Sequence, residues 1–125
     1  MLFGDLLSLS LIQVESERGL LSAEIQWELK QPVSNDFTVF VHLYDASGQL
    51  VSQADGDLLR GLAPFGLWET GQRLRDFRQL AIPDTGSYSL GLGVYNRLNG
   101  SRVTVTDAAG NRFANDVAII YQFDP

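Results

Sequence analysis

Residues 36–48 read DFTVFVHLYDASG, and this stretch is the strongest indicator of the fold. Within it, residues 37–44 alternate between two faces: Phe, Val, Val and Leu on one, and Thr, Phe, His and Tyr on the other. Alternation with a period of two, in β-branched and aromatic residues, is typical of a β-strand. The DASG that follows favours a turn, and residues 49–53 begin a returning strand. The stretch therefore predicts a β-hairpin with one apolar face.

The rest of the chain repeats this pattern and shows almost no helical periodicity. Short strands separated by turn signals predict an all-β, antiparallel two-sheet sandwich of about seven to nine strands, either immunoglobulin-like or jelly-roll. We expect residues 1–125 to form a single domain. Because the chain opens almost directly on a strand pattern, we also expect this domain to be cut from a longer protein. The expected strands are 3–13, 20–30, 36–45, 49–54, 73–82, 87–95, 102–106 and 113–123.

Alternation also predicts which side chains face the interior. The expected inner rows are Ile25, Trp27 and Leu29; Leu90, Leu92 and Val94; and Val117, Ile119, Tyr121 and Phe123.

The outer faces predict a pair of neighbouring strands. Gly91 and Gly93 leave the outer face of their strand bare, whereas Phe40 and His42 place bulk on the outer face of theirs. Aromatic rings laid over cross-strand glycines stabilise sheets. Strands 36–45 and 87–95 are therefore expected to be neighbours.

Composition excludes several classes of function. The net charge is −6, with 15 acidic and 9 basic side chains, so nucleic acid and anionic lipid surfaces would be repelled. Cysteine is absent, which excludes thiol catalysis, disulfides and thiolate metal sites. The apolar run 6–14 is broken by polar residues and is too short to insert into a membrane. No cofactor is indicated.

Three acids form a candidate metal site. Asp55 and Asp57 begin a long irregular segment, and Asp76 has the parity of an apolar face. Calcium needs six to eight oxygen ligands, of which the sequence shows only part. Structural hydrogen bonding to backbone N–H groups, or to Arg60 or Arg102, is the favoured alternative.

Aromatic residues form a candidate ligand site. Trp68, beside Phe65 and Leu67, could be a sugar-stacking platform together with Tyr44 or Tyr95. The favoured alternative is that Trp68 packs against one end of the sandwich.

No catalytic residue is predicted. His42 is the only histidine, it lies in the middle of a strand, and the chain has no G-x-S-x-G motif. A partly buried ring that covers a glycine is the favoured interpretation of His42.

The order of elements resembles that of small β-sandwich domains of unknown function in bacteria. Such domains are found at the extracytoplasmic C-terminal ends of mannosyltransferase-like membrane glycosyltransferases, and in related surface proteins. The matching segments span nearly the whole chain: Ile25 to Trp27, Phe37 to Leu43, Asp45, Gly48, Val51 to Gly56, Leu67 to Gly71, Asp76, Ile82-Pro83, Gly86 to Tyr88, Gly91 to Tyr95, and Arg102.

This resemblance implies a non-catalytic accessory domain outside the cytoplasm or at the cell surface. Its partners would be the membrane domain of the parent chain or a surface glycan. A free-standing carbohydrate-binding module is the alternative.

Overall fold

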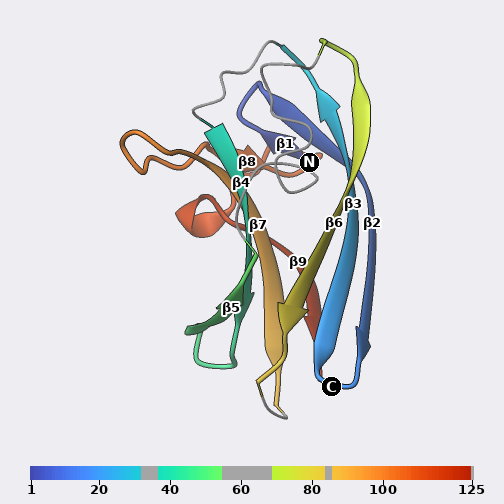
Figure 1. The fold of residues 1–125 in the computed structure, drawn as a ribbon. Helices are drawn as coiled ribbons and strands as arrows, with labels where there is room; N and C mark the ends of the chain where they lie inside the picture. Colours follow the sequence, from blue (N-terminus) through green and yellow to red (C-terminus); the bar gives the residue numbers. More distant parts are fainter. Residues whose placement is uncertain (32–36, 55–68, 84–85, 125) are drawn as a thin grey trace.

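The protein is a sandwich of two antiparallel β-sheets (Figure 1). The computed structural model describes residues 1–31, 37–54, 69–83 and 86–124. One sheet has the strand order β6-β3-β2-β1-β8, and the other has the order β5-β4-β7-β9. The predicted fold class is thereby confirmed. The strands are β1 (Leu2–Phe3), β2 (Leu7–Glu17), β3 (Leu20–Leu29), β4 (Phe37–Tyr44), β5 (Leu50–Gln53), β6 (Arg73–Ala81), β7 (Tyr88–Asn96), β8 (Val105–Thr106) and β9 (Ala118–Phe123).

The two sheets enclose one hydrophobic core. Alternate residues of β3 are buried along its whole length, as the sequence predicts, and Trp27 is fully enclosed. The Trp27 ring packs edge-on against Phe3, with 5.0 Å between the ring centroids. The predicted row on β7, Leu90, Leu92 and Val94, faces this core from the opposite sheet.

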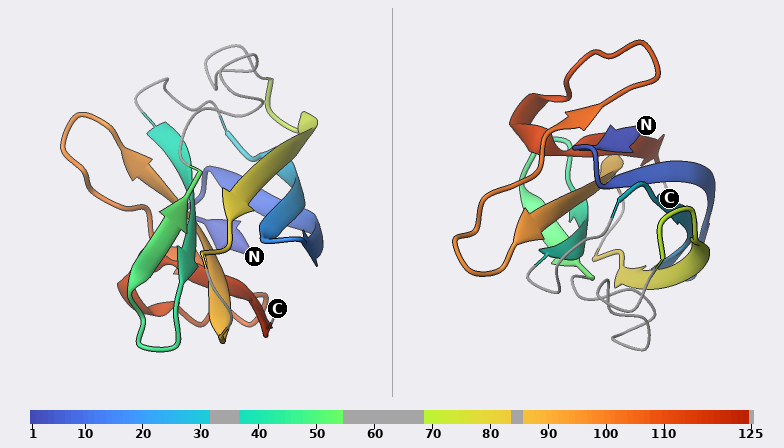
Figure 2. Two further views of the ribbon diagram at one scale, coloured as in Figure 1. Left: turned by 60° about the horizontal axis from the view of Figure 1, so that its bottom comes forward. Right: turned by 90° about the horizontal axis from the view of Figure 1, so that it is seen from above.

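Strand β4 differs from β3 because both of its faces are buried. Its aliphatic residues face the core, and Thr38, Phe40 and His42 lie almost entirely buried on the outer face. At these three positions the outer face of the sheet is therefore covered by other parts of the chain. The hairpin after β7 projects from the body of the molecule on this side (Figures 1 and 2).

Strands β4 and β7 are neighbours, as predicted. Phe40 is the cross-strand partner of Gly93, and His42 is the partner of Gly91. The Phe40 ring lies directly on Gly93, so that a Cβ built there would be 2.1 Å from Phe40 Cζ. The nearest side-chain atoms over Gly91 belong instead to Val117 and Tyr44. The expectation that the His42 ring covers a glycine is therefore wrong, and Tyr44 is the aromatic residue that lies over Gly91.

The expected strand 3–13 is two strands. Gly4 adopts a φ of +58°, and the N–H of Leu6 donates to the carbonyl of Phe3 at 3.2 Å, which makes a tight turn between β1 and β2. Since glycine reaches positive φ without steric cost, a single Gly4 inside an apolar run is enough to reverse the chain.

The predicted inner row of the last strand is wrong at its start. The pairing of β7 with β9 shifts between Leu90 and Gly91, because Leu90 faces Tyr121 while Gly91 faces Ile119. A β-bulge inserts one residue and reverses the parity of the side chains on either side of it. Ala118 therefore enters the core, and Ile119 is 40% exposed on the outer face.

Two other expected strands are shorter than predicted. The segment 102–106 contributes only β8 and an isolated bridge between Arg102 and Tyr95. The segment 113–123 begins with a single 3-10 turn, η3 (Ala114–Asp116), before β9.

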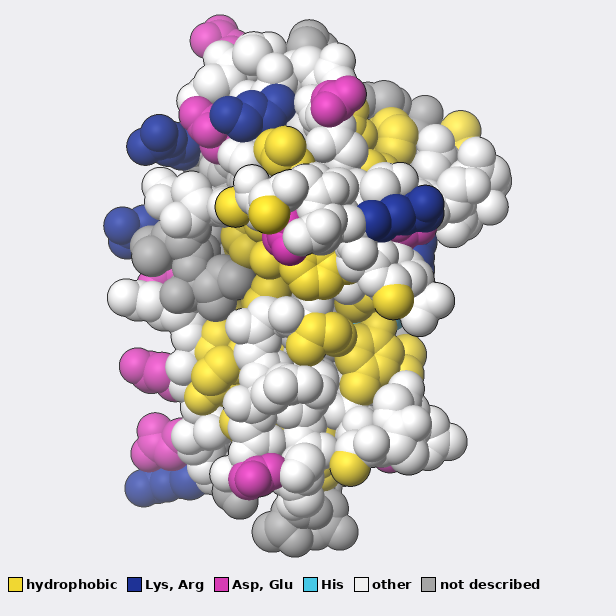
Figure 3. Space-filling model, turned by 180° about the vertical axis from the view of Figure 1, so that it is seen from behind, with side chains coloured by type: hydrophobic (Ala, Val, Ile, Leu, Met, Phe, Trp, Pro, Cys, Tyr) yellow, Lys and Arg dark blue, Asp and Glu magenta, His cyan; other side chains and the backbone are white. Residues whose placement is uncertain are grey.

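Hydrophobic side chains are also visible on the surface. On the face behind the view of Figure 1 they gather along the middle, with most acidic and basic side chains toward the margins (Figure 3). No helix in the described part of the chain is long and apolar enough to cross a membrane.

Candidate functional site

The outer face of the four-stranded sheet carries a row of rings. Phe40, His42 and Tyr44 follow one another on this face of β4, with centroids 4.5 Å apart for the first pair and 5.9 Å for the second. The hydroxyl of Tyr44 lies 3.1 Å from Nδ1 of His42, within hydrogen-bonding distance. The row exists because the even-numbered residues of β4 share one face.

Arg102 lies over one end of this row. Its guanidinium carbon is 4.6 Å from the centroid of the Phe40 ring, a cation–π contact. One of its nitrogens, Nη1, donates to the backbone carbonyl of Asn115 at 3.1 Å. Arg102 thus links the sheet to the turn η3 and is held in one orientation.

The turn η3 forms a wall beside the sheet. Asn115 and Asp116 have φ values of +58° and +55°, a conformation that Asn and Asp tolerate better than most residues. The carboxylate of Asp116 accepts from Nε and Nη2 of Arg112 at 3.1 and 3.2 Å. This two-point ion pair fixes the wall.

Between the wall and the sheet lies an open hollow of about 640 Å³, here called the outer-sheet hollow. Tyr44, Val117 and Ile119 supply apolar surface, and Arg102, Asn115 and Ser89 supply polar groups. Its size is in the range of small-molecule sites. The remaining lining residues are Asp45, Ala46, Gly48, Ala114 and Asp116.

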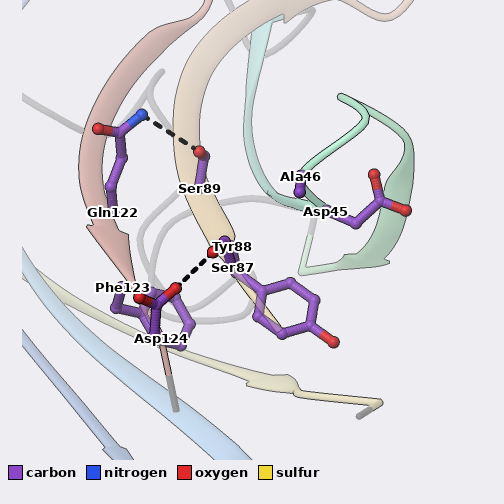
Figure 4. A pocket seen from close by; sticks show the side chains of 8 residues that line it. All are labelled: Asp45, Ala46, Ser87, Tyr88, Ser89, Gln122, Phe123 and Asp124. Carbon is purple, nitrogen blue, oxygen red and sulfur yellow. Dashed lines mark hydrogen bonds between the residues drawn. The ribbon is translucent and has the colours of Figure 1, made fainter. Parts of the chain in front are cut away.

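A second hollow of about 430 Å³, here called the end hollow, lies where β7 and β9 meet the turn after β4 (Figure 4). Ser87 donates to Asp124 at 2.5 Å, and Gln122 donates to Ser89 at 3.5 Å. Asp45, Ala46 and Ser89 line both hollows. The two therefore adjoin along the side of the β4–β5 turn.

Asp45 is engaged by its own turn. Its Oδ1 accepts from the Ser47 hydroxyl at 2.6 Å and from the backbone N–H groups of Ser47 and Gln49, both at 2.9 Å. These bonds, the one from the Ser47 hydroxyl foremost, hold the pKa of Asp45 below its ordinary value of 3.8. Asp45 therefore contributes a fixed negative charge to the rim, and it does not act as a proton donor at neutral pH.

The proposed aromatic platform is only partly assembled among the described residues. Tyr44 lines the outer-sheet hollow. Tyr95 lies on the same sheet face, with its ring 6.3 Å from that of Phe40, but it does not line this hollow. Trp68 lies outside the described residues, as do its neighbours Phe65 and Leu67.

The proposed metal site has one described member. Asp76 is fully buried, and its Oδ2 accepts from Nε of Arg78 at 2.9 Å. Among the described residues, Asp76 therefore forms its ion pair with Arg78, and not with Arg102 as the sequence analysis proposed. Asp55, Asp57 and Arg60 lie outside the described residues. Among those that are described, no three His, Cys, Asp or Glu side chains group as metal ligands.

Sequence patterns did not point to Ile119, Asn115 or the stacked position of Arg102. Ile119 was assigned to the core because a bulge cannot be read from alternation alone. The pair Asn115-Asp116 is a signal for positive φ that could have indicated the wall.

Searches against protein-family models and against curated proteins find no match to this chain.

Proposed function

We propose that this β-sandwich is a non-catalytic binding domain whose outer-sheet hollow binds a glycan. It would serve as an accessory domain of a larger bacterial membrane or surface protein, positioned outside the cytoplasm.

The observation that carries this proposal is the composition of the outer-sheet hollow. A sugar ring has apolar C–H faces and a rim of hydroxyl groups. Tyr44 and Ile119 offer apolar surface to the first, and Ser89, Asn115 and Arg102 offer hydrogen-bonding groups to the second. Apolar walls with a few placed polar groups are characteristic of ligand sites.

The accessory role is supported by the resemblance to extracytoplasmic sandwich domains of mannosyltransferase-like membrane enzymes. In such enzymes catalysis takes place within the membrane part, so the domain itself needs no catalytic group. The setting of His42 agrees with this. It is 8% exposed and its ring is packed between Phe40 and Tyr44, an environment that serves packing.

A glycan array followed by titration calorimetry tests the binding proposal. Ile119→Glu places a charge on the apolar part of the hollow and is expected to weaken glycan binding by about tenfold or more, because it removes apolar contact and adds a desolvation cost. Leu20→Glu is the matched control. Leu20 is also 40% exposed but lies on β3 in the other sheet, so this variant should bind as the wild type does.

Absence of any binding glycan, or equal loss of binding in both variants, would refute the proposal. The alternative of a free-standing carbohydrate-binding module shares the same hollow. The two differ in the parent gene: many hydrophobic spans encoded upstream of Met1 favour the accessory domain. Hydrolase activity of the isolated domain would overturn both.

A further inference from the structure

We infer that the glycan recognised in the outer-sheet hollow is acidic, and that Arg102 is the residue that selects it by binding a sugar carboxylate. This inference rests on the proposed function and narrows it to one chemical class of ligand.

The first argument is that Arg102 forms no ion pair with a described carboxylate. No described carboxylate lies within ion-pair distance of its guanidinium, whereas Arg112, which is close in the sequence, is paired with Asp116. The chain carries 15 acidic side chains against 9 basic ones, so an arginine without an acidic partner is notable. Among the described residues that line the hollow, Arg102 is the positive group that remains for a ligand.

The second argument is preorganisation. The Phe40 ring and the Asn115 carbonyl hold the guanidinium from two directions. A guanidinium has five N–H donors, and the Asn115 bond uses one of them. An arginine already fixed in place loses little side-chain entropy on binding, and its planar fork matches a planar carboxylate.

The acids around the hollow are already engaged. Asp116 forms its ion pair with Arg112, and Asp45 accepts three hydrogen bonds within its turn. Neither carboxylate therefore competes with a ligand for the guanidinium of Arg102. Ser87 and Ser89, which line the adjoining end hollow, have hydroxyl groups that can contact neutral parts of a longer sugar chain.

The net charge of −6 opposes an anion only weakly at this point. Charges separated by more than about 8–10 Å are largely screened at physiological ionic strength, whereas a direct guanidinium contact is not. A polyanion such as nucleic acid or a lipid surface spans many such distances and is repelled as a whole. A single sugar carboxylate interacts mainly with the charges next to it, of which the Arg102 guanidinium would be in direct contact.

The test compares tetragalacturonate with the same tetrasaccharide after its carboxylates are reduced to hydroxymethyl groups. Calorimetric titration of the wild-type domain is expected to show at least about tenfold tighter binding of the acidic form, the scale of one charge-assisted hydrogen-bonded contact. Arg102→Gln should abolish this preference. Arg102→Lys keeps the charge without the fork and should restore part of it.

Arg75→Gln is the control for net charge. Arg75 pairs with Glu24 on the other sheet at 3.2 Å, and its removal changes the total charge by the same amount as Arg102→Gln. This variant should retain the full preference for the acidic glycan.

Equal binding of the two tetrasaccharides by the wild type would overturn the inference and leave the proposed glycan site standing. A preference that survives Arg102→Gln, or that is lost equally in Arg75→Gln, would also overturn it. Should Arg102→Gln not fold, the wild-type comparison and Arg102→Lys still decide the question. Binding of neither tetrasaccharide counts against the acidic ligand, and the glycan array then decides the proposed function separately.

Discussion

At the scale of single residues, the contact between Phe40 and Gly93 explains how the outer face of the sheet is built. The ring occupies the space that a side chain on β7 would need, and the Arg102 guanidinium lies over the ring. Phe40 is only 1% exposed as a result. Because glycine has no side chain, position 93 leaves room for the Phe40 ring, and the ring in turn supports the Arg102 guanidinium.

Gly93→Ala tests this contact. The new Cβ would lie 2.1 and 2.2 Å from two atoms of the Phe40 ring, so the ring must move out of a packed site. We expect a loss of about 1–3 kcal/mol in the free energy of unfolding, the usual cost of overpacking, measured by urea denaturation.

The Phe40→Ala background supplies the control for this substitution. Without the ring, Gly93→Ala should cost much less, so the two changes are expected to be strongly non-additive in a double-mutant cycle. Additive costs would mean that the strand is sensitive to alanine for another reason.

At the scale of elements, a buried arginine connects the edges of the two sheets. Arg78 on β6 donates from Nε to Asp76 and from Nη1 to the carbonyl of Ala54, the latter at 2.7 Å. Ala54 directly follows β5, and its own N–H donates to Val41 on β4 at 2.8 Å. Strands β6 and β5 belong to different sheets, so Arg78 joins the two layers at this edge.

Arg78→Met is expected to destabilise the fold by about 3–5 kcal/mol, because it breaks the buried ion pair with Asp76 and removes the hydrogen bond to the Ala54 carbonyl. Asp76→Leu combined with Arg78→Met removes both charges of the pair and should recover part of this loss. Urea denaturation of the three variants measures the coupling. If the double variant were as unstable as the sum of the single ones, the pair would not act as a unit.

At the scale of the whole molecule, the sequence predicts those features of the fold that follow from residue alternation. It does not predict the places where a bulge or a tight turn interrupts that alternation. Alternation located the inner row of β3 and the pairing of β4 with β7, since each follows from residue parity and from the fit of rings on glycines. The bulge before Gly91 and the turn at Gly4 leave no periodic signal, so Ile119 and the start of the chain were assigned wrongly.

The candidate site was harder to predict than the fold. Tyr44 was singled out from its type and position. The position of Arg102 over Phe40 depends on the path of the segment between β7 and β9, which no local pattern specifies. Side chains that meet through such connections can be found only from coordinates.

The same turn occurs twice in the molecule, and this repetition predicts how stability depends on pH. Asp45 and Asp107 each begin a turn that ends in glycine, and Oδ1 of each accepts from the backbone N–H groups two and four residues later. For Asp107 the bond from the N–H of Asn111 is foremost in lowering its pKa below the ordinary value of 3.8. The pKa of Glu28 is also lowered from its ordinary 4.5, chiefly by its hydrogen bond with Lys30.

A carboxyl whose pKa is lower in the folded chain than in the unfolded chain stabilises the fold when it is ionised. This contribution is fully present above the unfolded-state pKa and is lost as the pH falls through the folded-state value. The free energy of unfolding should therefore decline as the medium is acidified through the ordinary values of 4.5 for Glu28 and 3.8 for the two aspartates.

Asp107→Asn isolates one of these contributions, because asparagine keeps the accepting Oδ1 and removes only the charge. The stability difference between wild type and variant, measured by urea denaturation from about pH 7 to about pH 2, is expected to be largest near neutrality and to shrink in acid. Asp45→Asn should behave in the same way, because its turn has the same hydrogen bonds. A difference that stays constant across the whole range would show that the carboxylate charge does not stabilise the turn, and that the backbone geometry set by Gly110, with its φ of +86°, is sufficient.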